Sequence, residues 1–201
     1  MIKIELNGTV VVAMTYDEVA NELAADGSFA HFANPKRRRE KQLVNIILHD
    51  HFGVERSVVL LNDADGAPFL PGCERCVSVS HSDCEAAVAI SDHRIGIDVE
   101  HPREALLRVA PRFLSSRELD YYGGSMPLLV RAWTIKEAVY KAMRRKLMTS
   151  EDIALSCREP RDGRDFAVAD GVTLAVTLID MPGGALMAVA ETADAACRTT
   201  Q

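Results

Sequence analysis

Residues Ile95-Gly96-Ile97-Asp98-Val99-Glu100 alternate between apolar and acidic side chains after the glycine, as a β-strand does. Successive side chains of a strand point to opposite faces, so Asp98 and Glu100 should share one face while the aliphatic residues between them enter a core. Two carboxylates on one patch, near a Gly96 that keeps the backbone open, suit a hard cation such as Mg²⁺. The alternative is an edge strand with a solvated acidic face.

A helical pattern follows downstream, in the run from Arg131 to Ala142. Glu137 and Lys141 are one turn apart on one face of this expected helix, with Lys136 beside them. The apolar residues of the helix would pack on the sheet, which would make Glu137 a third carboxylate of the same metal site. An ordinary ion pair on an exposed helix is the alternative interpretation.

Together these two segments resemble the paired signature of the 4′-phosphopantetheinyl transferase superfamily, of the surfactin-synthetase-activating type. The signature joins a Gly-Ile-Asp-Val-Glu strand, here residues 96–100, to a helix motif Trp-Thr-x-Lys-Glu-Ala-x-x-Lys, here residues 133–141. The run Ser80-His81-Ser82 resembles a third motif of the family. The resemblance extends from Asp65 to Lys146 and implies a holo-carrier-protein synthase.

The resemblance implies the transfer of 4′-phosphopantetheine from coenzyme A to a serine of an apo acyl or peptidyl carrier protein, with release of adenosine 3′,5′-bisphosphate. Mg²⁺ bound by Asp98, Glu100 and Glu137 would stabilise charge on the pyrophosphate. Lys141, together with Lys136, would neutralise the leaving bisphosphate. The expected catalytic residues are therefore Asp98, Glu137 and Lys141, and either Glu137 or a metal-bound water would accept the serine proton.

Two other functions remain open from the sequence. One is a non-catalytic relative that binds carrier proteins, and the other is an unrelated Mg²⁺-dependent phosphohydrolase that uses the same carboxylates. The pathway is open as well, because fatty acid, polyketide and nonribosomal peptide biosynthesis are all compatible with the resemblance.

A basic cluster occupies the start of another expected helix. Asn34-Pro35 predicts the beginning of this helix, because asparagine caps and proline is favoured at the first helical position. The resemblance implies that Arg37 and Arg38 bind the 3′-phosphate of coenzyme A, and arginine can form bidentate hydrogen bonds to phosphate. A solvated basic turn is the alternative.

The loop Asp65-Gly66-Ala67-Pro68-Phe69-Leu70 resembles a family loop in which a basic residue stands between glycine and proline. In this chain Ala67 stands where the family has lysine, which removes a cation that would reach the coenzyme phosphates. Arg75 or the basic cluster around Arg37 would have to supply the positive charge that is missing at position 67.

Ser80 and His81 lie at the end of an expected strand, and the resemblance assigns both to coenzyme A binding. A competing interpretation is a zinc site, because the same region has a ligand-like spacing in Cys73, Cys76, His81 and Cys84. An extended chain would separate Cys76 from His81 by about 16 Å, which argues against a closed zinc site.

The composition is that of a soluble globular protein, with 201 residues, 48% hydrophobic and 26% charged, and the lack of a signal-peptide pattern leads us to expect a cytoplasmic location. The net charge of −6 argues against nucleic acid as a partner, and the absence of a long apolar run argues against a membrane. With no export signal in the sequence, the five cysteines are expected to be reduced thiols.

The order of expected elements predicts an α+β fold of two similar lobes, each with strands, helices and further strands. The boundary falls between residues 1–94 and 95–201. The resemblance implies that the lobes are related by a pseudo-twofold axis, that each has a small, mainly antiparallel sheet packed with helices, that coenzyme A binds between them, and that the protein is a monomer.

Overall fold

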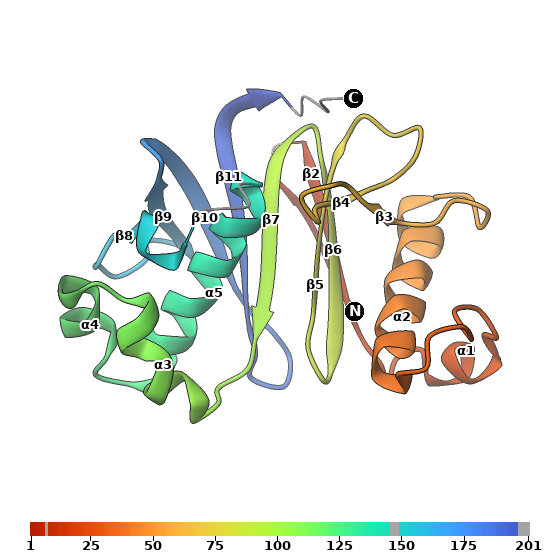
Figure 1. The fold of residues 1–201 in the computed structure, drawn as a ribbon, viewed down its shortest axis with the longest axis horizontal. Helices are drawn as coiled ribbons and strands as arrows, with labels where there is room; N and C mark the ends of the chain where they lie inside the picture. Colours follow the sequence, from red (N-terminus) through yellow and green to blue (C-terminus); the bar gives the residue numbers. More distant parts are fainter. Residues whose placement is uncertain (7, 145–148, 197–201) are drawn as a thin grey trace.

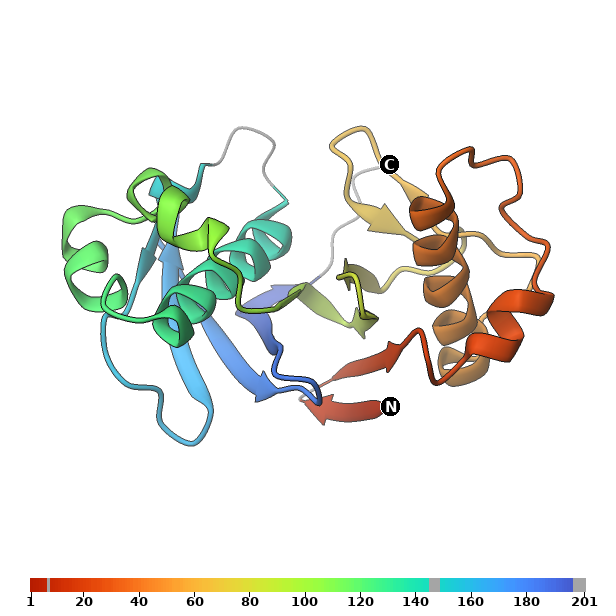
Figure 2. The ribbon, with the colours of Figure 1, turned by 90° about the horizontal axis from the view of Figure 1, so that it is seen from below.

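The computed structural model describes residues 1–6, 8–144 and 149–196. It is an α+β structure with two main antiparallel sheets and helices on their outer sides (Figure 1). Viewed from below, the strands lie in the middle and the helices lie at both ends (Figure 2). The α+β class and the antiparallel sheets predicted from the sequence are therefore confirmed, whereas the pseudo-twofold relation of the lobes stays a prediction.

The N-terminal sheet has the strand order β1-β2-β6-β5, and every neighbouring pair is antiparallel. Its strands are β1 (Ile2–Leu6), β2 (Thr9–Thr15), β5 (Cys76–His81) and β6 (Glu85–Ser91). The other elements of this half are α1 (Ala20–Ala25), α2 (Pro35–Phe52), and a hairpin of β3 (Leu61–Asn62) and β4 (Pro68–Phe69). Helix α2 packs on the sheet through apolar residues such as Leu43 and Ile47.

The C-terminal sheet has the strand order β7-β11-β10-β9-β8 and is also antiparallel. Its strands are β7 (His93–Glu100), β8 (Ile153–Leu155), β9 (Arg164–Ala169), β10 (Val172–Asp180) and β11 (Leu186–Ala196). The helices are α3 (Ala105–Phe113), α4 (Ser116–Tyr122), α5 (Met126–Met143) and the 3₁₀ helix η1 (Ser150–Asp152). Because β7 begins at His93, the predicted boundary between residues 94 and 95 lies inside a strand, and the division into two domains stays a prediction.

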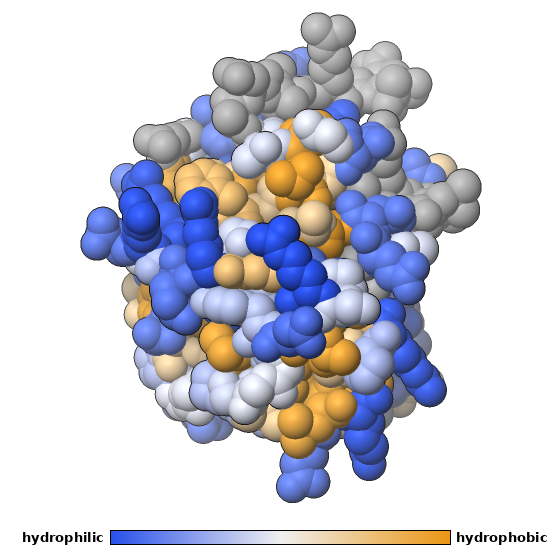
Figure 3. All heavy atoms as spheres, turned by 90° about the vertical axis from the view of Figure 1, so that its left-hand side faces the viewer, coloured by the Kyte–Doolittle hydropathy of each residue, from blue (hydrophilic) through white to orange (hydrophobic). Residues whose placement is uncertain are grey.

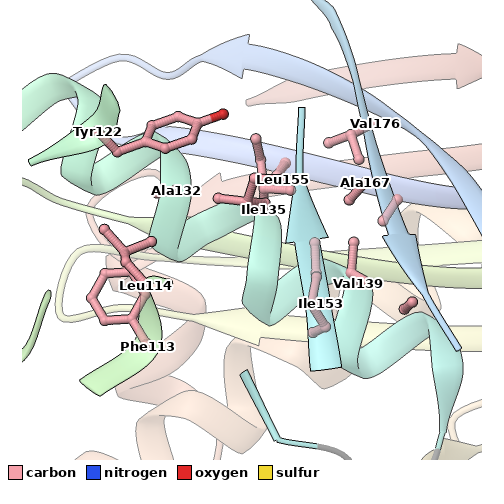
Figure 4. Packing of buried hydrophobic residues seen from close by; sticks show 14 of the residues in the cluster. Phe113, Leu114, Tyr122, Ala132, Ile135, Val139, Ile153, Leu155, Ala167 and Val176 are labelled. Atoms are coloured by element: carbon pink, nitrogen blue, oxygen red, sulfur yellow. The ribbon is translucent and has the colours of Figure 1, made fainter. Parts of the chain in front are cut away.

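Helix α5 is the centre of the C-terminal core. Its side chains Ile135 and Val139 lie among those of the neighbouring strands, including Ile153, Ala167 and Val176 (Figure 4). The outer face of this half carries hydrophilic side chains with hydrophobic ones between them (Figure 3). None of the helices in the described ranges is long and apolar enough to cross a bilayer.

The inner faces of the two sheets pack against each other through a core cluster of their own. Ile95, Ile97 and Val99 of β7 belong to this cluster, which confirms the predicted alternation along the strand. The sheets are also joined by serine side chains. The backbone N–H of Ile97 donates to Ser78 Oγ at 3.0 Å, and that of Val99 donates to Ser80 Oγ at 3.1 Å.

Gly96 lies on the opposite face of β7, directly against α5. A Cβ atom at this position would overlap the carbonyl oxygen of Ala138 and lie 2.5 Å from the backbone nitrogen of Ala142. The expectation that Gly96 leaves the backbone open was therefore wrong, because a helix covers it. The glycine is required for the close approach of α5 to β7, which sets the distance between their polar side chains.

Replacing Gly96 with alanine should lower the free energy of unfolding by about 3 kcal/mol or more, because the new methyl group meets backbone atoms that cannot rotate away. Urea unfolding of the variant measures this loss. Gly27→Ala is the matched control, since nothing lies within 4 Å of a Cβ there. Equal stability of the two variants would show that α5 can move away from β7 at little cost.

Candidate active site

Three carboxylates gather where α5 crosses β7. Asp98 and Glu100 are on the face of β7 that carries Gly96, and Glu137 is on α5. Burial raises the pKa of Glu137, and repulsion from Asp98 and Glu100 raises it further. Burial also raises the pKa of Glu100, with an additional contribution from Asp98. The three acidic groups are thus close enough to repel one another, and a cation beside them would be stabilising.

Basic side chains of the protein already contact two of these carboxylates. Lys141 Nζ donates to Asp98 Oδ1 at 2.8 Å and to the carbonyl of Ile97 at 2.9 Å. Arg103 donates to Glu100 Oε2 at 2.9 Å. Glu137 and Lys141 therefore face the same strand, as the helical spacing predicted.

The donor set has the chemistry of a site for a hard divalent cation, with carboxylate oxygens at a partly buried position. In the described ranges, however, no group of three or more histidine, cysteine, aspartate or glutamate side chains converges closely enough to hold a metal ion. A divalent ion would have to draw Asp98 away from Lys141 and Glu100 away from Arg103. The metal role of Asp98, Glu100 and Glu137 stays a prediction.

The described residues likewise contain no cluster of cysteine and histidine side chains that would support the competing zinc interpretation. Cys73 and Cys84 are free thiols, whereas Cys76 is disulfide-bonded. The expectation of reduced cysteines throughout was therefore wrong for Cys76, since an odd number of cysteines does not exclude one pair.

A cavity of about 480 Å³ lies next to the carboxylates, between the two halves of the chain. Its walls come from α2, the loop from Leu60 to Pro68, strand β5 and the C-terminal end of α5. The basic side chains that line it are Arg37, Lys41, His81, Lys141 and Arg144. Lys141 connects the cavity to the acidic group, because it lines the cavity and donates to Asp98. The arrangement is suited to an anionic ligand beside a cation-binding group.

Helix α2 directs one of its two predicted arginines into the cavity. The Asn34 side chain accepts from the backbone N–H groups of Lys36 and Arg37, which confirms the predicted cap and fixes the first turn. Arg37 lines the cavity. Arg38 points elsewhere: its guanidinium donates to the carbonyls of Phe32 at 2.9 Å and Ala30 at 3.3 Å. Arg38 thus contacts the preceding loop and does not line the cavity, and its assignment to coenzyme binding stays a prediction.

Two further predicted ligand-binding residues have structural contacts instead. Ser80 is 4% exposed, and its hydroxyl donates to Asp98 Oδ1 at 3.0 Å while accepting from Val99. Lys136 is 2% exposed and donates to Glu118 Oε2 at 2.9 Å and to the carbonyl of Ile153 at 2.8 Å. Neither belongs to the cavity wall. Lys136 faces away from Glu137 because adjacent helical positions differ by about 100°.

Sequence reasoning gave no individual role to Arg144, which lines the cavity from the end of α5. In the sequence it begins a basic run with Arg145 and Lys146, both of which lie outside the described residues. Tyr140 and Ser78 also line the cavity and were not predicted as site residues. Tyr140 is 39% exposed, and no pattern in the sequence set it apart as a site residue.

Comparison with known proteins agrees with the sequence signature. The sequence model of the 4′-phosphopantetheinyl transferase superfamily matches residues 94–175. The chain is also similar to the 4′-phosphopantetheinyl transferase gsp of Aneurinibacillus migulanus, with 32% identity over 71 residues. That alignment covers 33% of this chain and 30% of the relative, so the chain matches less than a third of the relative's length. Both halves of the signature lie within residues 94–175, and the predicted resemblance to the superfamily is confirmed.

Lys136→Met should lower the free energy of unfolding by about 3 kcal/mol or more, because it leaves the buried Glu118 carboxylate without its cation. Thermal and urea unfolding measure the loss. Lys36→Met is the control, since the Lys36–Asp83 pair is exposed and should contribute little. If Lys136→Met matched this control in stability, the structural role assigned to Lys136 would be wrong.

Glu137→Gln should make the protein more stable at neutral pH. The folded state raises the pKa of Glu137 above its ordinary value of 4.5, so ionisation of this group opposes folding at higher pH. The gain should shrink as the pH falls through the raised pKa and should be absent below 4.5, where the carboxyl is protonated in both states. Urea unfolding between acid and neutral pH tests this, with the exposed Glu22→Gln as control. A gain that is the same at every pH would contradict the electrostatic cause.

Proposed function

We propose that this protein transfers the 4′-phosphopantetheine group of coenzyme A to a serine of an apo acyl or peptidyl carrier protein, in a Mg²⁺-dependent reaction that releases adenosine 3′,5′-bisphosphate. One observation carries the proposal: the Asp98, Glu100 and Glu137 carboxylates adjoin a basic cavity, and Lys141 contacts both. If these residues formed only ordinary ion pairs on an exposed surface, which is the alternative interpretation, we would not expect a cavity with basic side chains beside them. The superfamily match gives independent support.

The cavity has the chemistry to bind the nucleotide end of coenzyme A. Arg37 and Lys41 from α2 offer positive charge to the 3′-phosphate, and arginine adds directional hydrogen bonds. His81 lies 3.5 Å from Glu40 Oε1 through its Nδ1 and also lines the cavity, where a ring N–H can donate to phosphate. Apolar residues such as Val44 and Leu60 line the same cavity and provide surface for a base.

In the proposed reaction, the carrier serine oxygen attacks the β-phosphorus of coenzyme A. The bond from that phosphorus to the bridging pyrophosphate oxygen breaks, and its electron pair leaves with adenosine 3′,5′-bisphosphate. Lys141 lies where it can offset the charge that develops on this leaving group. A divalent ion held by Asp98, Glu100 and Glu137 would supply further stabilisation of pyrophosphate charge.

Glu137 is the proposed acceptor of the serine proton. A carboxylate can act as a general base, and a water bound to the divalent ion is the alternative acceptor. The close approach of α5 to β7 holds Glu137 beside Asp98 and Lys141, so the proton acceptor and the leaving-group cation come from the same helix.

The transfer reaction is tested with the purified protein, coenzyme A, Mg²⁺ and several apo carrier proteins. We expect the mass of at least one carrier to increase by one phosphopantetheine group. Asp98→Asn should reduce the rate by about 100-fold or more, because it removes a charge at the centre of the acidic group while preserving its shape. Asp92→Asn makes the same change at a surface ion pair with Arg75 and should leave the rate unchanged.

Other outcomes separate the competing functions. Binding of carriers without any gain in mass would favour a non-catalytic docking protein, and release of inorganic phosphate without transfer would favour a phosphohydrolase. Transfer by Asp98→Asn at the wild-type rate, with an unchanged circular dichroism spectrum, would overturn the role of the acidic group.

A further inference from the structure

Helix α5 ends in an arginine with an unusual backbone conformation. Arg144 is the C-cap residue, with φ 52° and ψ 37° in the left-handed region. Glycine is the favoured residue at such a position because it has no Cβ to clash with the backbone. Arginine is therefore less favourable than glycine at the end of this helix. Its side chain, however, makes contacts that glycine could not make.

The side chain of Arg144 crosses from the C-terminal half to the N-terminal half. Its Nη2 donates to the carbonyl of Val77 on β5 at 3.1 Å and to the carbonyl of Pro68 at the edge of the loop at 3.4 Å. Neither acceptor is a carboxylate, although Asp63 of the same loop is near enough to interact electrostatically with the guanidinium. The half-buried guanidinium lines the cavity and stays charged at neutral pH.

The loop that Arg144 reaches has no basic residue of its own. Residues 62–68 read Asn-Asp-Ala-Asp-Gly-Ala-Pro, and Asp65, Gly66 and Ala67 line the cavity. On the α2 wall an anionic ligand would meet Arg37 and Lys41 together with the acidic Glu40, whereas on the loop wall it would meet Asp65 and the methyl group of Ala67. Arg144 places a cation at this second wall from outside the loop.

The geometry points to Arg144 as the residue that binds a phosphate of the nucleotide at the loop wall, in place of a basic residue at position 67. This inference rests on the proposed use of coenzyme A. It makes Arg144 a substrate-binding residue: the guanidinium fork would donate to phosphate oxygens while its contacts with Val77 and Pro68 hold it in position.

Arg75, which the sequence offered as a substitute for the missing basic residue of this loop, is engaged elsewhere. Its Nε donates to Asp92 Oδ1 at 2.8 Å and its Nη2 to the carbonyl of Gly8 at 3.0 Å. It is not among the residues that line the cavity. Arg75 is therefore a matched control for Arg144: both are arginines that donate to carbonyls of the N-terminal half, but one faces the cavity.

The substitution Arg144→Gly tests this inference, because glycine is compatible with the left-handed backbone conformation and the substitution removes the positive charge. We expect it to weaken the binding of coenzyme A and of adenosine 3′,5′-bisphosphate by about tenfold or more, measured by calorimetry at a fixed salt concentration. Arg144→Lys should lose less, and Arg75→Ala should bind as the wild type does. The decisive variant is Ala67→Lys in the Arg144→Gly background, which should regain affinity because it restores a cation to the loop wall without restoring the contacts of Arg144.

The outcomes distinguish this inference from the proposed function. If the wild-type protein transfers phosphopantetheine and Arg144→Gly binds both nucleotides equally well, the inference is wrong and the function stands. If Arg144→Gly loses affinity and Ala67→Lys restores none of it, Arg144 acts by joining the two halves, and the inference is again wrong. If the wild-type protein binds neither nucleotide, the proposed function itself fails.

Discussion

The close contact between α5 and β7 at Gly96 is the constraint on which the rest of the site depends. The helix backbone lies where any larger residue would place its Cβ, so the two elements are held nearer than ordinary side chains would permit. This closeness brings Glu137 and Lys141 over Asp98. Backbone packing thus sets the positions of the acidic group and of Lys141. The same packing holds the three carboxylates close enough to repel one another.

The cavity has a different origin from the acidic group. Its walls belong to both halves of the chain, and the end of α5 is the part of the C-terminal half that reaches into it. Lys141 and Arg144 are both on this end, less than one turn apart. One helix therefore contributes a carboxylate at the acidic group, a lysine at its border and an arginine at the far wall of the cavity.

Local periodicity predicted the parts of the site that depend on one element. The alternation at 95–100 correctly separated Asp98 from Ile97, and the helical spacing correctly put Glu137 and Lys141 on one face. The predictions that required knowledge of neighbouring elements were less successful. Lys136 is buried against Glu118, a partner that is distant in sequence.

The same limitation applies to two arginines. Arg38 and Arg37 are adjacent in a basic run, and composition does not reveal which of them is drawn to the carbonyls of a preceding loop. The left-handed conformation of Arg144 has no sequence signal when the residue is not glycine, and its acceptors on Pro68 and Val77 come from the other half of the chain.

The serine bridges between β5 and β7 have a consequence for solubility. Each of these strands is the terminal strand of its own sheet, and an uncovered terminal strand is a template for pairing with another molecule. The hydroxyls of Ser78 and Ser80 satisfy backbone donors of β7 that a foreign strand would otherwise seek. The N-terminal half thereby covers an edge of the C-terminal sheet, and the C-terminal half would lack this protection against strand pairing if it were expressed alone.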